Sequence, residues 1–139
     1  MTALKKMLQR ITHSIYHAVF GIMTSCLGWY ILVHHDYLDD PHQTWQPIPD
    51  LEKYAGFADD IWFGIIILII GLGLLIGVLC NVKWLKRYGM FACAGVYFLL
   101  CFAFGIRGLI ESYFNLAWVT DVITAIVAIK VASSGNDDA

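Results

Sequence analysis

The feature that most constrains this chain is a run of twenty consecutive residues without a charge, Ile61–Cys80, which reads IWFGIIILIIGLGLLIGVLC. As a helix rising 1.5 Å per residue, the run covers about 30 Å, which is the thickness of a hydrocarbon core. It therefore predicts a transmembrane helix. Transmembrane strands alternate apolar and polar side chains, and this run does not, so we expect helices rather than strands.

Three further stretches are apolar enough to cross a bilayer: Tyr16–Val33, Gly89–Ile110 and Phe114–Ala132. Together with the first run they predict an all-α integral membrane protein of one domain, 1–139. Its four transmembrane helices, at about 14–33, 61–81, 88–110 and 114–132, are expected to form an antiparallel bundle. The segment 34–60 is expected to be an extracytoplasmic loop. Lys83–Tyr88 predicts a tight connection, and Glu111–Tyr113 a turn between the last two helices.

Composition excludes two broad classes of protein. Hydrophobic residues make up 59% of the 139 residues and charged residues 14%, whereas soluble domains average roughly 45–50% and 25%. So few charged groups cannot cover the surface of a soluble globule of this length. The formal net charge of −2 offers no basic excess to neutralise phosphates, so we expect no nucleic-acid partner.

The distribution of basic residues predicts the orientation. Seven of the nine fall before the first helix, between the second and third, or at the end of the fourth, and eight of the eleven acids fall on the opposite side. By the positive-inside rule, this predicts a multi-pass protein of the cell inner or plasma membrane with both termini cytoplasmic. Aromatic residues then gather at both boundaries, with Trp29, Trp62 and Trp118 at the outer one and Trp84 at the inner one.

Small residues within the spans predict where helices pack. Helices in lipid associate through close backbone approach, because lipid tails are as apolar as leucine. Gly73 and Gly77 form a GxxxG pair, with Gly64 and Gly71 nearby, and whether the pair meets this chain or another copy stays open. The cysteines form no CxxC pair, so packing is expected of them rather than redox chemistry or zinc binding. The predicted packing residues are Gly73, Gly77, Gly89, Cys93, Cys101, Gly105, Ala125 and Ala128.

Ionisable residues inside the spans give the sharpest functional hypothesis. Arg107 and Asp121 are expected at similar depth on adjacent helices, with Glu111 one turn above Arg107. A charge at a helix centre costs about 2.5–3.5 kcal/mol, so we predict an ion pair between Arg107 and Asp121, with Glu111 as a second partner. The pair either locks the helical hairpin or forms an ion or proton site opening outward. A third possibility is that Arg107 reaches the headgroups.

Histidines give two weaker candidates. His34, His35, Asp36 and His42 are side chains that suit a borderline metal, but their spacing in an irregular loop matches no known site, so we expect an ordinary acidic loop and no metal. His13 and His17 share a helical face. No other span supplies a histidine for a haem, so we expect no cofactor.

No nucleophile elbow, HExxH motif, phosphate-binding loop or dinucleotide fingerprint is present, and we expect no enzyme. The leading hypothesis is a non-enzymatic protein acting through helix–helix association, as an accessory subunit or a homo-oligomer, with the bilayer and a membrane protein as partners. The alternative is a small transporter or an ion- or proton-conducting oligomer using Asp121 and Arg107. A phage-type lysis or superinfection protein and a four-helix redox enzyme are further alternatives.

Overall fold

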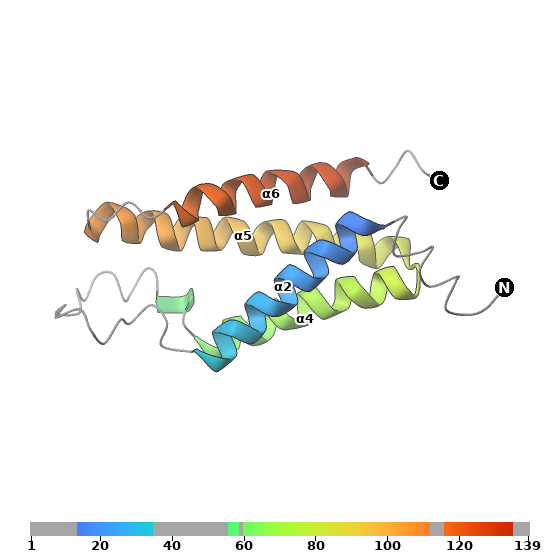
Figure 1. Ribbon diagram of the computed structural model, residues 1–139, viewed down its shortest axis with the longest axis horizontal. Coiled ribbons are helices and arrows are strands. Elements are labelled where there is room, and N and C mark those ends of the chain that lie inside the picture. The colour runs from blue at the N-terminus through green and yellow to red at the C-terminus, as the bar shows by residue number, and fades with distance from the viewer. Residues whose placement is uncertain (1–13, 35–55, 59, 112–115, 135–139) are drawn as a thin grey trace.

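Four α-helices make up most of the computed structural model, which describes residues 14–34, 56–58, 60–111 and 116–134, without the side chains of 107–111 (Figure 1). The helices are α2 (Ile15–Val33), α4 (Ile61–Leu79), α5 (Lys83–Glu111) and α6 (Ala117–Ser134), and a 3₁₀ turn, η1 (Gly56–Ala58), precedes α4. Each α-helix is long and apolar enough to cross a membrane. This confirms the prediction of an all-helical chain with four such helices.

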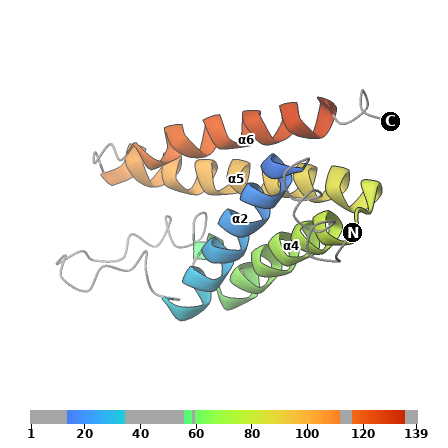
Figure 2. The same ribbon diagram turned by 45° about the vertical axis from the view of Figure 1, so that its right-hand side comes forward.

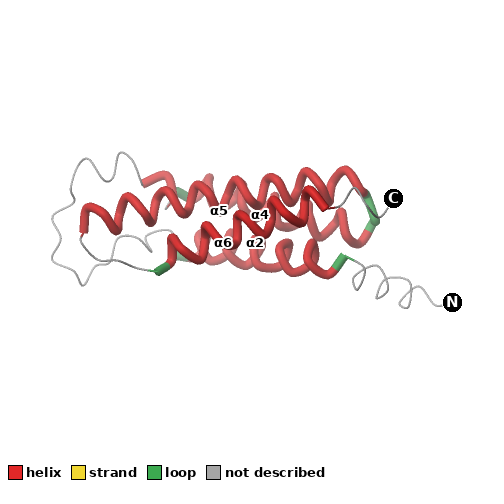
Figure 3. The backbone as a smooth tube through the Cα atoms, turned by 90° about the horizontal axis from the view of Figure 1, so that it is seen from above, coloured by secondary structure: helices red, strands yellow, loops and turns green. Residues whose placement is uncertain are grey.

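The helices form two pairs that meet along α4 and α5. Consecutive helices run in alternating directions, and α5 lies between α6 and α4 (Figures 1 and 2). α2 crosses α4 and packs mainly on it, α6 packs mainly on α5, and α2 and α6 barely meet. Seen from above, all four axes extend along the same long direction of the molecule (Figure 3).

α5 begins five residues earlier than the sequence predicted, so Lys83–Tyr88 is helix rather than a connection. The turn is shorter because Asn81 adopts a left-handed conformation, with φ of 56°. The Val82 N–H donates to the Gly77 carbonyl at 2.9 Å, and the Asn81 N–H to the Val78 carbonyl at 3.2 Å. This pair of bonds is a Schellman motif, which ends α4 and lets α5 start at once.

The other boundaries differ less from the prediction. α4 ends at Leu79, α6 runs from Ala117 to Ser134, and Glu111 is the last residue of α5. The rest of the predicted turn, 112–113, lies outside the described residues, as does most of the predicted loop 34–60. Within that loop, η1 lies against α4, where Phe57 meets Phe63 edge to face at 5.4 Å.

Glycines bring the backbones of α2 and α4 into contact. A Cβ placed on Gly28 would lie 2.5 Å from the Leu68 nitrogen, and one on Gly71 would lie 2.5 Å from the Ser25 nitrogen. Gly21 on α2 contributes to the same seam, because a Cβ there would meet Leu75 at 2.8 Å. No larger residue fits at Gly28 or Gly71 without parting the helices.

The predicted packing residues divide into three groups. Gly77 faces Leu85 and Gly89 faces Leu74, so both lie where α4 meets α5. Among the other predicted residues, three are fully buried, Cys93, Ala125 and Ala128, and Cys101 is partly buried. Gly73 and Gly105 have open space around them, since a Cβ on either would meet no described atom within 4 Å.

Large apolar side chains cover the outside of the bundle. Ile22, Ile69, Phe98 and Ile126 are 54%, 63%, 61% and 57% exposed, one on each helix. A soluble monomer rarely exposes apolar surface so continuously. This outer surface and the four membrane-length helices define a multi-pass membrane protein.

Candidate functional site

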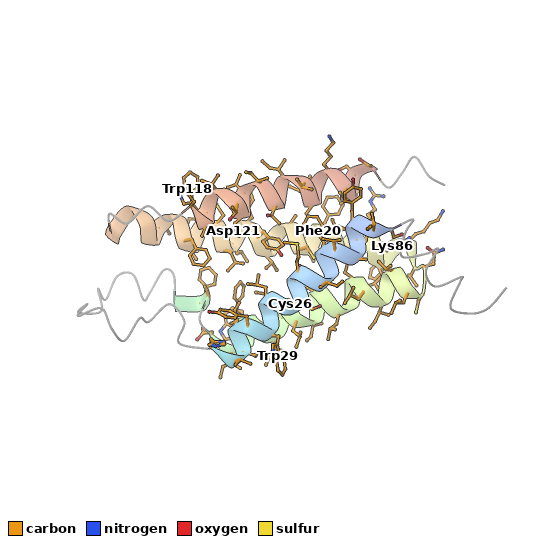
Figure 4. The ribbon with its side chains drawn as sticks, viewed as in Figure 1. Phe20, Cys26, Trp29, Lys86, Trp118 and Asp121 are labelled. Atoms are coloured by element: carbon orange, nitrogen blue, oxygen red, sulfur yellow. The ribbon has the colours of Figure 1, made fainter. Side chains whose placement is uncertain are left out.

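Asp121 carries the one acidic side chain described within the four membrane-length helices, in the second turn of α6. The nearby threonine hydroxyls make their hydrogen bonds within α6. The Thr120 hydroxyl donates to the Ala117 carbonyl and the Thr124 hydroxyl to the Thr120 carbonyl, both at 2.7 Å. Asp121 is partly buried and points toward α5 (Figure 4). Its Oδ2 atom is fully buried and has no hydrogen-bond partner among the described residues.

Two polar side chains on α5 lie near this carboxyl group. Asp121 interacts electrostatically with the Tyr97 hydroxyl and with the Cys101 thiol, which are one helical turn apart. Tyr97 is only 5% exposed, and its ring meets Phe20 of α2 edge to face with centroids 6.4 Å apart. The carboxyl group therefore lies on the side of α6 that faces α5, where its charge acts on Tyr97 and Cys101.

A buried hydrogen bond extends this group of polar side chains to α2. The Thr24 hydroxyl donates to Cys93 Sγ at 3.4 Å, and both residues are fully buried. Thr24 also interacts with Tyr97. We term five polar side chains from three helices the polar row: Thr24, Cys93, Tyr97, Cys101 and Asp121. Asp121 interacts with Tyr97 and Cys101 electrostatically, and its buried Oδ2 makes no hydrogen bond to a described residue.

The predicted partners of Asp121 fall outside what the structure describes. The side chains of Arg107 and Glu111 are not among the described ones, so the Arg107–Asp121 pair stays a prediction. Arg107 lies six positions after Cys101, which places their Cα atoms about 9 Å apart along α5. Asp121 thus interacts with a turn of α5 deeper in the span than Arg107.

A lone carboxylate inside a span is unfavourable: a charge costs about 2.5–3.5 kcal/mol at a membrane helix centre and less in the second turn, where Asp121 lies. Three arrangements avoid that cost. Asp121 carries a proton, it binds a small cation, or it pairs with a basic group such as Arg107. The hydroxyl and thiol groups of the polar row can each donate or accept hydrogen bonds.

A second polar cluster lies at the opposite end of α5. Lys86 Nζ donates to Ser14 Oγ at 3.2 Å and to Asn81 Oδ1 at 2.9 Å, and Lys86 interacts electrostatically with His17. Lys86 therefore ties the start of α2 to the turn between α4 and α5. Sequence reasoning used Lys86 only for orientation. Nothing local to Lys86 indicates a bond to a residue 72 positions earlier.

The weaker histidine candidates are only partly described. The His34 ring stacks on Tyr30 with centroids 4.5 Å apart, while His35, Asp36, His42 and His13 lie outside the described residues. Across the described ranges, no group of three or more His, Cys, Asp or Glu residues is placed to hold a metal ion.

No protein-family model, curated protein or solved structure matches this chain. What the molecule does is therefore inferred from its own residues.

Proposed function

We propose that this protein acts in the inner or plasma membrane through helix–helix association, as an accessory subunit or a homo-oligomer, without chemistry of its own. The observation that carries this proposal is the incomplete closure of the bundle. α6 packs broadly on one neighbour, α5, and barely meets α2. Its outward residues Ile123, Ile126 and Ile129 are 57%, 57% and 43% exposed.

Unused small residues support the same proposal. Four glycines close the contact between α2 and α4. By contrast, Gly73, Gly95 and Gly105 lie in open space with respect to the described residues. Glycine weakens a helix interior by about 1 kcal/mol relative to alanine. A glycine without a neighbour in its own chain is explained by the close approach of a helix from another chain.

The proposed orientation places the end that carries Lys83 and Lys86 in the cytoplasm. Trp84 and Tyr88 lie at that end with ring centroids 5.0 Å apart. At the other end, the Trp62 indole donates to Asp60 Oδ2 at 2.6 Å. Basic residues on one side and tryptophans near both boundaries support an inside–outside assignment.

Native mass spectrometry of the protein extracted directly from its membrane into lipid nanodiscs tests the proposal. We expect either two or more copies of the chain or a stoichiometric second membrane protein. A single copy with no bound protein, at native expression level, would contradict it. Protease digestion of terminal tags on intact cells tests the orientation, since both tags are expected to resist.

A second candidate function is transport of protons or small cations, and one observation favours it. Asp121 Oδ2 is buried without a hydrogen-bond partner among the described residues, at one end of the polar row. In proteoliposomes, Asp121→Asn is then expected to abolish flux, whereas Asp60→Asn, which changes a carboxyl group just before α4, is expected to preserve it. Absence of flux in the unchanged protein would remove this candidate.

A further inference from the structure

Positive charge gathers at one end of the bundle. The alternating helices bring the start of α2, the turn between α4 and α5, and the end of α6 to this end, where Lys86 lies (Figures 1 and 4). Seven of the nine basic residues belong to these segments of the sequence, against two acids, Asp137 and Asp138, which leaves an excess of five positive charges. The acidic residues within the described ranges all lie toward the other end.

The first turns of α5 concentrate this charge. Lys83, Lys86 and Arg87 fall within five consecutive residues, and Lys86 interacts electrostatically with Lys83. No acid is present in the first turn of α5. Cations at the start of a helix also face the positive end of its dipole. Both effects disfavour the three basic groups where they are, and an anion bound among them would relieve both.

The structure holds one of these cations in a fixed position. Lys86 is partly buried, and its Nζ donates to Ser14 Oγ at 3.2 Å and to Asn81 Oδ1 at 2.9 Å. Both acceptors are uncharged, so these bonds orient the ammonium group without neutralising it. An ammonium group has three N–H donors, and the two described bonds use two of them. Lys86 can therefore donate to an anion while it bonds α2 and the α4–α5 turn.

The order of side chains around α5 places this charge at the depth of lipid headgroups. At about 100° per residue, Lys83 and Arg87 share one exposed face of α5. Lys86 borders this face on the side of α2, and the aromatic pair Trp84 and Tyr88 borders it on the other side. The two rings are 65% and 55% exposed, with centroids 5.0 Å apart. Amphipathic rings of this kind lie at the boundary between headgroups and acyl chains.

We propose that Lys83, Lys86 and Arg87 bind the phosphate group of an anionic phospholipid at the membrane boundary. Basic groups gathered where membrane helices meet bind phospholipid headgroups, and Lys86 joins two helices here. The guanidinium of Arg87 suits a phosphate because it can donate two parallel hydrogen bonds. This inference goes beyond the proposed function and holds for one copy of the chain or for several.

A lipid fits this position better than free phosphate. The exposed rings of Trp84 and Tyr88 lie beside the basic face, and the outer surface of α5 continues from them with the exposed apolar side chains Phe91 and Phe98. A phospholipid satisfies both parts of this surface, because its headgroup is anionic and its acyl chains are apolar. Free phosphate satisfies only the first part.

Native mass spectrometry of the delipidated full chain tests the site, with phosphatidylglycerol and phosphatidylcholine of identical acyl chains as probes. We expect phosphatidylglycerol to bind at least about tenfold more tightly. Lys83→Gln/Arg87→Gln is expected to weaken its binding about thirtyfold, since each basic residue near a membrane surface contributes about fivefold. Lys5→Gln/Lys6→Gln removes the same charge from the segment before α2 and is the matched control, with an expected change of less than about threefold.

Two further variants separate a formed site from diffuse attraction and from misfolding. Ser14→Ala changes no charge but removes an acceptor that holds Lys86, so we expect phosphatidylglycerol to bind about threefold more weakly. Diffuse attraction would leave its affinity unchanged. Lys83→Arg/Arg87→Lys keeps both charges and is expected to retain most of the binding.

Four outcomes would overturn the inference or part of it. Equal affinity for the two lipids, or equal losses in the two double glutamine variants, would overturn the site. Unchanged binding in Ser14→Ala would overturn the part assigned to Lys86. A loss in Lys83→Arg/Arg87→Lys as large as in the glutamine variant would overturn recognition by charge. Displacement of phosphatidylglycerol by millimolar inorganic phosphate would overturn the lipid as the ligand and assign the site to free phosphate.

Discussion

The two helix pairs of this protein are held together in different ways. α2 and α4 meet backbone to backbone, with Gly28 against Leu68 and Gly71 against Ser25. α5 and α6 meet through small side chains instead, since Ala125 and Ala128 are fully buried, and a carboxyl group lies at the same contact. Glycines close the first pair, and the second pair holds the one acidic side chain described within the four helices.

The difference concerns how far each contact can rearrange. A glycine contact tolerates no added atom, so α2 and α4 form a fixed unit. α6 packs mainly on α5 and barely on α2, so α6 can shift its position against α5 more easily than α2 can shift against α4. We expect substitutions at the α2–α4 contact to lower the free energy of unfolding more than substitutions at the α5–α6 contact.

The largest effect is expected where an added side chain meets backbone. Gly71→Val places atoms where the Ser25 nitrogen lies 2.5 Å from the Cβ position, so α2 must move away from α4. We expect a loss of about 3 kcal/mol in the free energy of unfolding, at the upper end for overpacking. Denaturation by dodecyl sulfate in bicelles measures it. Gly73→Val, two residues along, is the control, and equal losses in both variants would contradict the glycine seam.

A smaller effect is expected from overpacking the second pair. Ala128→Leu adds volume at a fully buried position between α5 and α6. Because α6 can shift outward, we expect a loss of about 1–2 kcal/mol, below that of Gly71→Val. The neighbouring Val127→Leu, at a 39% exposed position, should cost less than half as much. A loss larger than that of Gly71→Val would reverse the comparison between the pairs.

Breaking the predicted ion pair with Asp121→Asn is expected to lower the free energy of unfolding by about 1 kcal/mol. Asp121→Asn removes the charge but keeps the shape, and interhelical polar contacts in membranes are worth roughly 0.6–1.7 kcal/mol. In the same denaturation assay, exchanging both residues in Arg107→Asp/Asp121→Arg should recover most of what Arg107→Asp loses alone. Failure of the exchange to recover stability would show that Arg107 does not partner Asp121.

The smallest effect is expected from the buried hydroxyl of the polar row. Thr24→Val keeps the side-chain shape and deletes the hydrogen bond to Cys93. We expect a loss of about 0.6 kcal/mol, the average for such bonds within membranes. Thr124→Val is a matched control, because the Thr124 hydroxyl bonds only its own helix. Indistinguishable unfolding curves for the two variants would mean that the bond between α2 and α5 contributes nothing.

Much of the fold could be predicted because membrane-spanning helices are recognisable in a sequence from their length and apolar composition. The sequence analysis did not predict the early start of α5, because it assigned Lys83–Tyr88, with its three basic residues, to a connection. Asn81 is nevertheless a residue type that ends a helix in the left-handed conformation. The seam of α2 was also missed, and a signal for it existed. Gly21 and Gly28 are seven residues apart, as are Gly64 and Gly71 on the partner helix.

The polar contacts between helices could not be predicted from the sequence. Thr24 and Cys93 are 69 residues apart, and each is individually an ordinary residue of an apolar span. Asp121 was singled out because its charge is rare in such a span. Its neighbours Tyr97 and Cys101 depend on the rotation of α6 about its own axis, and no local pattern specifies that rotation.

The bond from Lys86 to Ser14 has a consequence for biogenesis. At about 5–20 residues per second, a ribosome needs roughly 4–14 s to add the 72 residues between them. α4 is complete at Leu79, seven residues before Lys86, so α2 and α4 can pack on their glycines before the Lys86 side chain is added. The hydrogen bond between Lys86 and Ser14 can form only after the first turn of α5 has been synthesised. The order of synthesis therefore allows the glycine contact of the first pair to form before the bond that joins α2 to α5.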